Sequence, residues 1–275
     1  MKTTAFSFLT VILALTCPGG DRAAGQKHFV QLKCSLAPIA IETIHHRADP
    51  RIRNTDGSSL NWGGYAVETN LKKPQKGSVD SVAGQWLEPN VSASSSASTY
   101  SAFWVGIDGD SSSSVEQLGT EGDWTPGGEQ HYAWFEMYPK AGFTITGFPV
   151  APGDQIGAGV RHSGNGQFVL AITNYTAGVY FVVPANYSRS RSAACSSAEW
   201  IVEAPFAGGV LPLADFGTIP FAECRTEVNG VSGSILNPGW QFEAITMQTQ
   251  SGTAKAIPSP LSQDGTSFSV RWRHE

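Results

Sequence analysis

The stretch that ends in Glu203 carries the first candidate for acid–base chemistry. The run Ser196–Glu203 is followed by Pro205, which predicts a strand stopped by proline. Side chains alternate along a strand, so Glu199, Ile201 and Glu203 share one face. A carboxylate in that position can take a proton from a water that attacks a carbonyl carbon, and can then pass a proton to the leaving amine.

Gln117 is the second candidate, and its chemistry complements that of Glu203. In an extended run Val115–Trp124 it shares a face with Val115, and an inward amide must be satisfied by the protein or by a substrate. An amide N–H can stabilise the oxyanion of a tetrahedral intermediate. Because an amide does not titrate, it remains a donor in acid, where a histidine base would be protonated.

Other clusters support weaker readings. The run Tyr132–Pro139 puts Tyr132, Trp134, Glu136 and Tyr138 on one face, which suits a cleft for extended polymers but also suits plain core. Asp108 and Asp110 form an Asp-x-Asp pair that suits calcium, but the remaining ligands of a calcium loop do not follow. The sequence has no CxxC pair, which argues against a zinc site. No histidine lies in a recognisable nucleophile context. We therefore expect no metal and no cofactor.

The elements that position these residues are predicted to be strands. Glycine and proline are abundant, and helix formers are scarce. Short runs rich in valine, threonine and aromatic residues are separated by turn residues, which is typical of an all-β antiparallel sandwich of two packed sheets. The clearest runs are 62–69, 79–87, 100–107, 131–138, 168–173, 179–183, 242–248 and 268–272.

The N-terminal part has the pattern of an export precursor. Lys2 precedes the apolar run 5–15, which is too short to span a bilayer, and small and turn-forming residues follow. We expect a signal peptide at 1–19, a pro-segment at 20–58 and one catalytic domain at 59–275, with secretion as the destination and no membrane partner. A loose terminal tail is the alternative for 20–58.

Charge divides the chain into a basic leader and an acidic remainder. Residues 21–60 hold 6 Lys and Arg against 4 Asp and Glu, plus three histidines, whereas residues 61–275 hold 11 against 19. The acidic balance argues against nucleic acid as a partner. The opposed charges indicate that the leader covers the acidic site and is released in acid.

Cysteines and sequons leave two questions open. In an exported protein Cys195 and Cys224 are expected to form a disulfide near the Glu203 strand. Asn90, Asn174 and Asn186 are sequons that matter if the host glycosylates secreted proteins.

Five ordered blocks make the sequence similar to the glutamic peptidases, or eqolisins. The resemblance runs from Asn61 to the C-terminus, and its blocks are Asn61–Gly64, Trp104–Asp110, Gln117–Gly119 before Asp123-Trp124, Ala133–Pro139 and Ala198–Glu203. One departure is the run Ser111–Ser114, where fungal members tend to carry a cysteine.

The resemblance implies a fold, an activity and a set of site residues. The fold would be a β-sandwich of the concanavalin-like jelly-roll type, and the protein a secreted endopeptidase active in acid and made with a signal peptide and a propeptide. We also expect a monomer that acts on proteins and peptides and has its own pro-segment as a partner. The catalytic pair would be Gln117 and Glu203. The substrate site would include the tryptophans and acidic residues of the same blocks, namely Trp62, Trp104, Trp134, Asp108, Asp123 and Glu136.

Two other classes of function remain open at this point. A β-sandwich glycoside hydrolase would use Glu136 and Glu203 as its pair of carboxylates. A non-catalytic glycan-binding sandwich would bind sugar and would keep that binding after Glu203→Gln.

Overall fold

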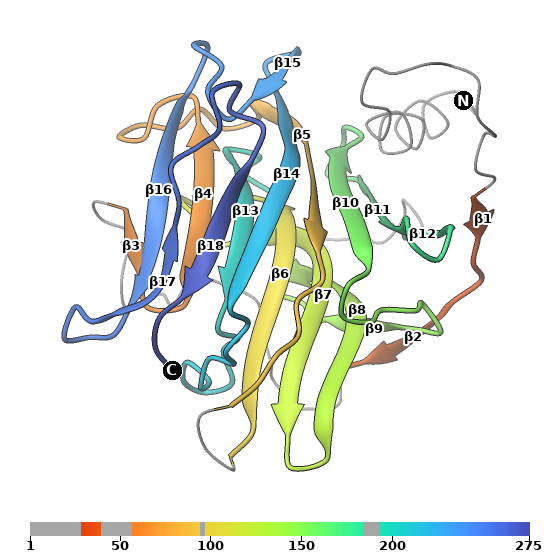
Figure 1. The fold of residues 1–275 in the computed structure, drawn as a ribbon. Helices are drawn as coiled ribbons and strands as arrows, with labels where there is room; N and C mark the ends of the chain where they lie inside the picture. The colour runs from red at the N-terminus through yellow and green to blue at the C-terminus, as the bar shows by residue number, and fades with distance from the viewer. Residues whose placement is uncertain (1–28, 40–56, 94–96, 184–192) are drawn as a thin grey trace.

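The computed structural model describes residues 29–39, 57–93, 97–183 and 193–275, and within them the chain forms strands and no helix (Figure 1). No helix in this part of the chain could therefore cross a membrane. The predicted signal peptide lies outside the described residues, as does most of the predicted pro-segment. The predicted domain boundaries stay predictions.

Sheet 1 carries every candidate site residue except Asp108, which follows the end of β6. In spatial order its strands are β2 (Ser35–Pro38), β9 (Phe143–Thr146), β8 (Gly128–Tyr138), β7 (Val115–Thr125), β6 (Thr99–Ile107), β13 (Ser197–Glu203), β4 (Trp62–Glu68) and β16 (Gln241–Gln248). All these neighbours pair antiparallel. The short β3 (Ser58–Ser59) lies parallel to β16.

Sheet 2 packs against sheet 1 and is continuous with it through β16. Its order is β1 (Val30–Gln31), β12 (Val179–Val183), β11 (Phe168–Asn174), β10 (Gln155–His162), β5 (Val79–Leu87), β14 (Thr218–Val228), β18 (Phe268–Trp272), β17 (Ala254–Pro258) and β16, with β15 (Val231–Ser234) folded onto β14. The sandwich is thus closed at β16, and its opposite side lies between β12 and β9.

The main core fills the space between the sheets. From sheet 1 it takes the residues of β13 and β6 that alternate with the candidate site residues, among them Trp200 and Phe103. The Trp200 indole reaches across and donates to the Ala83 carbonyl of β5 at 2.8 Å. Gly84 makes room for it, because a Cβ there would lie 2.8 Å from the ring. The two sheets are therefore locked face to face at β13.

The predicted sandwich of two antiparallel sheets is confirmed, and each of the eight predicted runs coincides with a strand. The alternation predicted for β13, β7 and β8 also holds, because the register places the same-face residues in common cross-strand rows. Several strands were not predicted, including β1 and β2 within the predicted pro-segment.

The expected disulfide is absent, and one sequon is unsuited to glycosylation. Cys195 and Cys224 are both buried free thiols. The Cys195 backbone pairs with the start of β5, whereas the Cys224 thiol contacts the Ala222 carbonyl within its own strand. Asn174 is fully buried, and its amide donates to Pro149 and Asp154. A glycan could not be attached there without unfolding this region.

Candidate active site

Glu203 lies on the outer face of sheet 1, at the end of β13. The register pairs it with Trp62 of β4 on one side and Ala102 of β6 on the other. Its side chain is fully buried, and both carboxylate oxygens accept hydrogen bonds: Oε1 from Asn61 Nδ2 at 3.0 Å and Oε2 from Trp104 Nε1 at 2.8 Å. Two N–H donors stabilise the charged carboxylate and fix its orientation.

Gln117 lies on the same face, in β7. It pairs with Gly106 of β6 and with Glu136 of β8. Its Nε2 donates to Glu136 Oε2 at 3.3 Å, and the amide is buried. When ionised, the Glu136 carboxylate can accept a hydrogen bond but cannot donate one. It therefore fixes the orientation of the Gln117 amide, with the NH2 group toward Glu136.

The Trp104 indole lies between the two candidate groups. A Cβ on Gly106 would lie 2.9 Å from the indole ring and 3.1 Å from the Gln117 Cβ, so the ring edge rests on Gly106 beside Gln117. The indole nitrogen, at another part of the same ring, bonds Glu203. Trp62 packs edge-on against this ring with centroids 4.9 Å apart. The indole thus borders Glu203 through its nitrogen and Gln117 through its ring.

Strand register sets the separation of the two groups. Gln117 is level with Gly106 and Glu203 with Ala102, four residues apart along β6. At about 3.3 Å per residue their backbones are offset by about 13 Å along the strands. The Gln117 and Glu203 side chains therefore start from different cross-strand rows and must reach a reacting peptide from either side of Trp104.

Glu199 belongs to a group of carboxyls on the same face, which we call the carboxyl cluster: the buried Glu68 and Glu199, with the partly buried Glu243 and Asp110. Glu199 shares the row of Gln117 through Gly106 and is level with Glu243 through Ala66. Burial, with nearby carboxylates adding to it, raises the pKa of Glu68 to about 7, that of Glu243 to about 8 and that of Glu199 well above its ordinary value. These three glutamates are protonated in acid.

The carboxyl cluster predicts that the fold is more stable in acid than at neutral pH. A carboxyl whose pKa is raised by folding stabilises the native state fully below its unfolded value, near 4.5, and this contribution is lost as the pH rises through 7 to 8. Allowing for the partial exposure of Glu243, the loss should be on the order of a few kcal/mol. Thermal unfolding of an inactivated chain should show a midpoint that falls steadily from pH 4 to pH 8.

Neutral substitutions test which groups are responsible. Glu68→Gln and Glu199→Gln should each flatten the fall, because an amide has no proton to lose. Glu223→Gln is the control, since Glu223 is a partly exposed residue beside Arg225. A midpoint that stays level or rises toward pH 8 in the unsubstituted chain would contradict the prediction.

Asp108 and Asp123 occupy different surroundings. Asp108 follows the end of β6 in a left-handed conformation, and its oxygens accept from the backbone N–H groups of Cys195 at 2.7 Å and Ser196 at 2.9 Å. It fastens the turn that leads into β13. Asp123 lies on the outer face of β7, where it accepts from the Tyr132 hydroxyl at 3.4 Å.

Two residues near the site were missed by sequence reasoning. Asn61 bonds Glu203, and Glu121 is buried in the row of Glu203 beside Ala102. Glu199, which the sequence places on this face, shares the row of Gln117. Alternation along β7 could have placed Glu121 on this face as well. Asn61 precedes the first residue of β4, and no periodicity would have revealed its contact.

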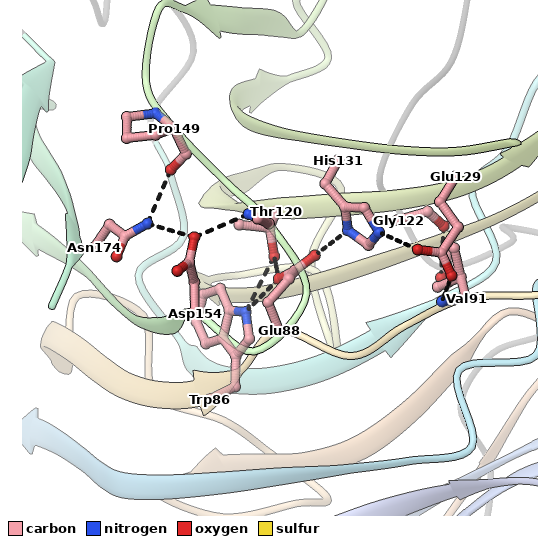
Figure 2. Close-up of polar contacts among 12 residues, drawn as sticks. Trp86, Glu88, Val91, Thr120, Gly122, Glu129, His131, Pro149, Asp154 and Asn174 are labelled. Carbon is pink, nitrogen blue, oxygen red and sulfur yellow. Dashed lines mark hydrogen bonds and ion pairs between the residues drawn. The ribbon is translucent and has the colours of Figure 1, made fainter. Parts of the chain in front are cut away.

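His131 lies on the opposite, core-facing side of sheet 1 and belongs to a polar network (Figure 2). Its Nδ1 is 2.8 Å from Glu88 Oε1, and Glu88 Oε2 also accepts from the Thr120 hydroxyl at 2.6 Å. Glu88 follows β5, so this network connects the two sheets. The sheet itself separates His131 from Glu203 and Gln117. His131 is therefore not part of the candidate site.

Trp104→Phe tests whether the indole N–H is important for Glu203. Hydrogen bonds to charged groups contribute about 1.5–3 kcal/mol, so losing this donor should lower kcat/KM by about tenfold or more. Trp62→Phe is the matched control, because the Trp62 Nε1 has no acceptor within the described residues. Both changes remove the same volume from the same cluster. Equal losses in the two variants would show that packing, and not the hydrogen bond, matters.

Comparison with known proteins finds a matching family model and a related peptidase. A model described as the Peptidase A4 family matches residues 60–272. Scytalidopepsin B of Scytalidium lignicola is 28% identical over 210 residues, which cover 76% of this chain and 74% of that protein.

Solved structures of similar fold include two glutamic peptidases. Scytalido-glutamic peptidase with a transition state analog inhibitor gives a TM-score of 0.64 at 24% identity, covering 78% of this chain and 98% of that one. Aspergilloglutamic peptidase from Aspergillus niger gives 0.57 at 22% identity, covering 64% and 99%. At these identities the likeness shows the β-sandwich fold. Because the family model spans most of the sequence, the chain belongs to the Peptidase A4 family and is a glutamic-type endopeptidase.

Proposed function

We propose that this protein is a secreted acid endopeptidase in which Glu203 activates water and Gln117 stabilises the oxyanion. The observation that carries the proposal is the environment of Glu203: a buried carboxylate, held by Asn61 and Trp104, on the same sheet face as a buried amide. The substrates are protein and peptide chains.

The reaction follows from these two groups. The ionised Glu203 takes a proton from a water molecule as its oxygen bonds to the carbonyl carbon of the scissile peptide. Negative charge then develops on the carbonyl oxygen, where the Gln117 N–H donates. The C–N bond breaks as Glu203 returns the proton to the departing nitrogen, so the carboxylate is regenerated. Trp62, Trp104 and Trp134 lie in a buried apolar cluster on the same face and would line the site for a bound peptide.

The raised pKa values in the carboxyl cluster favour activity at low pH. At low pH Glu68, Glu199 and Glu243 are neutral, so fewer negative charges on the outer face surround the carboxylate of Glu203. The amide donor is unaffected by pH. We therefore propose an activity that is highest in acid and falls toward neutrality as the cluster ionises.

The test is an assay of the purified protein on an unfolded protein and on a β-glucan, from pH 3 to pH 7. Cleavage of the protein in acid, with no sugar released, is the expected result. Release of sugar without peptide cleavage would favour the glycoside hydrolase alternative, in which Glu136 and Glu203 would be the two carboxylates. Binding of glycan without any cleavage would favour the non-catalytic alternative.

Activity should not depend on a metal ion. The described residues contain no group of three or more His, Cys, Asp or Glu side chains arranged to hold one. Incubation with a chelator is expected to leave the rate of peptide cleavage unchanged. A loss in chelator that added calcium restores would contradict this, with Asp108 and Asp110 as the first residues to examine.

A further inference from the structure

Residues 29–39, which the sequence assigns to the pro-segment, are built into both sheets. We call this segment the strap. Its β1 pairs parallel with β12 at the edge of sheet 2, and its β2 pairs antiparallel with β9 at the edge of sheet 1. Figure 1 shows β1 and β2 in red and orange along this side of the molecule. The strap therefore spans the side of the sandwich opposite β16.

Backbone hydrogen bonds hold the strap at both ends. Val30 N–H donates to the Gly178 carbonyl at 3.0 Å and Leu32 N–H to the Tyr180 carbonyl at 2.9 Å. At the other end, Ile39 N–H donates to the Gly142 carbonyl at 3.3 Å. Without the strap, β12 and β9 would be open sheet edges with unpaired backbone groups.

Apolar side chains add to this attachment. Leu32 and Cys34 pack against the core between the sheets. The Phe29 ring meets the Tyr175 ring edge-on, with centroids 5.7 Å apart. Loss of the strap would expose this part of the core, in addition to the two edges.

The Ile39 end of the strap reaches the candidate active site. Ile39 packs against the apolar cluster of the outer face, which includes Trp104 and Trp134. A Cβ on Gly142 would lie 2.8 Å from Ile39 Cδ1 and 3.5 Å from Glu136 Cβ, so Ile39 borders Glu136. Glu136 in turn bonds Gln117.

We propose that the strap is a permanent part of the mature enzyme: it stays bound without a covalent link after the chain is cut between residues 40 and 56, and Ile39 remains as a wall of the site beside Glu136. The mature enzyme is then two chains. This differs from the charge-based release expected from the sequence, because the contacts of the strap are backbone hydrogen bonds and apolar packing.

Acid should not release the strap. Within the described residues, the titratable groups in the strap or in contact with it are Lys33, Cys34, Tyr175 and Tyr180, and Glu136 borders Ile39. Lysine, cysteine and tyrosine side chains keep their charge state between about pH 4 and pH 7. The one charged side chain of the strap itself is Lys33, six residues before Ile39.

The test separates the strap from the catalytic proposal by using an inactivated chain. A recognition sequence for a site-specific protease is inserted between Asp49 and Pro50 of the full-length Glu203→Gln protein, which is then cut and passed through gel filtration at pH 7 and at pH 4. Mass spectrometry of the main peak should find the N-terminal fragment in equimolar amount at both values. A main peak that is folded but lacks the fragment would overturn the proposal.

Two proline variants test the mode of binding. Leu32→Pro removes an N–H that bonds β12, whereas Gln31→Pro removes one that strand alternation directs away from β12. The fragment should be lost from the cut Leu32→Pro protein and retained by Gln31→Pro. Retention in both would show that the strap is not held as an edge strand.

Hydrogen exchange on the uncut Glu203→Gln chain keeps the proposal testable if Leu32→Pro does not fold. The Val30, Leu32 and Ile39 amides should exchange slowly and the Gln31 amide quickly. Equally fast exchange at all four positions would show that the strap is not docked in solution.

Discussion

Glu203→Gln is expected to lower kcat/KM for peptide cleavage by at least 100-fold. The amide keeps the shape of the carboxylate but cannot take a proton from water, and general-base catalysis typically contributes a factor of about 100 to 10,000. The oxygen of the new amide can still accept from Trp104 Nε1, and its NH2 group would face Asn61, whose own amide can turn so that its oxygen accepts. The measurement is initial rate on an unfolded protein substrate in acid.

The controls for this prediction concern folding and charge. The variant should unfold at or near the temperature of the unsubstituted protein when both are protected from self-cleavage. Glu223→Gln removes a partly exposed carboxyl next to Arg225 and should leave the rate unchanged. A Glu203→Gln enzyme that keeps more than about a tenth of its activity would rule out Glu203 as the base.

Gln117→Ala is expected to lower kcat by about 100- to 1000-fold, with a much smaller change in KM. The reason is that an oxyanion donor acts mainly in the transition state, where charge has developed on the carbonyl oxygen. Gln155→Ala is a matched control, because Gln155 is a strand glutamine of sheet 2 whose amide donates to Gln85, away from the site. A large rise in KM with kcat unchanged would instead indicate that Gln117 only binds substrate.

Gln117→Glu distinguishes a donor from a polar spacer. The new carboxyl would lie next to Glu136 and, where ionised, would repel the oxyanion instead of stabilising it. Activity should therefore be low, and lower toward neutral pH than in strong acid. An enzyme as active as the unsubstituted one across this range would show that no N–H donor is needed at this position.

Much of the fold was determined by local patterns that the sequence displays directly. Strands β4, β5, β6 and β8 carry valine, threonine and aromatic residues between turn residues, and a period of two follows from strand geometry wherever it occurs. For that reason the shared face of Glu199, Ile201 and Glu203 could be predicted, as could that of Trp134 and Glu136.

Motif order carried the prediction of the family, and the match over residues 60–272 confirms it. Motifs do not give contacts between distant residues, however. The hydrogen bonds from Asn61 and Trp104 to Glu203 join residues 142 and 99 positions apart, so they depend on how β4, β6 and β13 are ordered and registered.

Only the tertiary structure decided the state of the cysteines and the place of the leader. Cys195 and Cys224 are both buried, yet they belong to separate hydrogen-bonded elements, and a spacing in sequence says nothing about the approach of two thiols. Residues 29–39 have no strong strand pattern of their own. They form strands because β12 and β9 offer open edges, and a sheet edge can order a short segment that has little intrinsic preference.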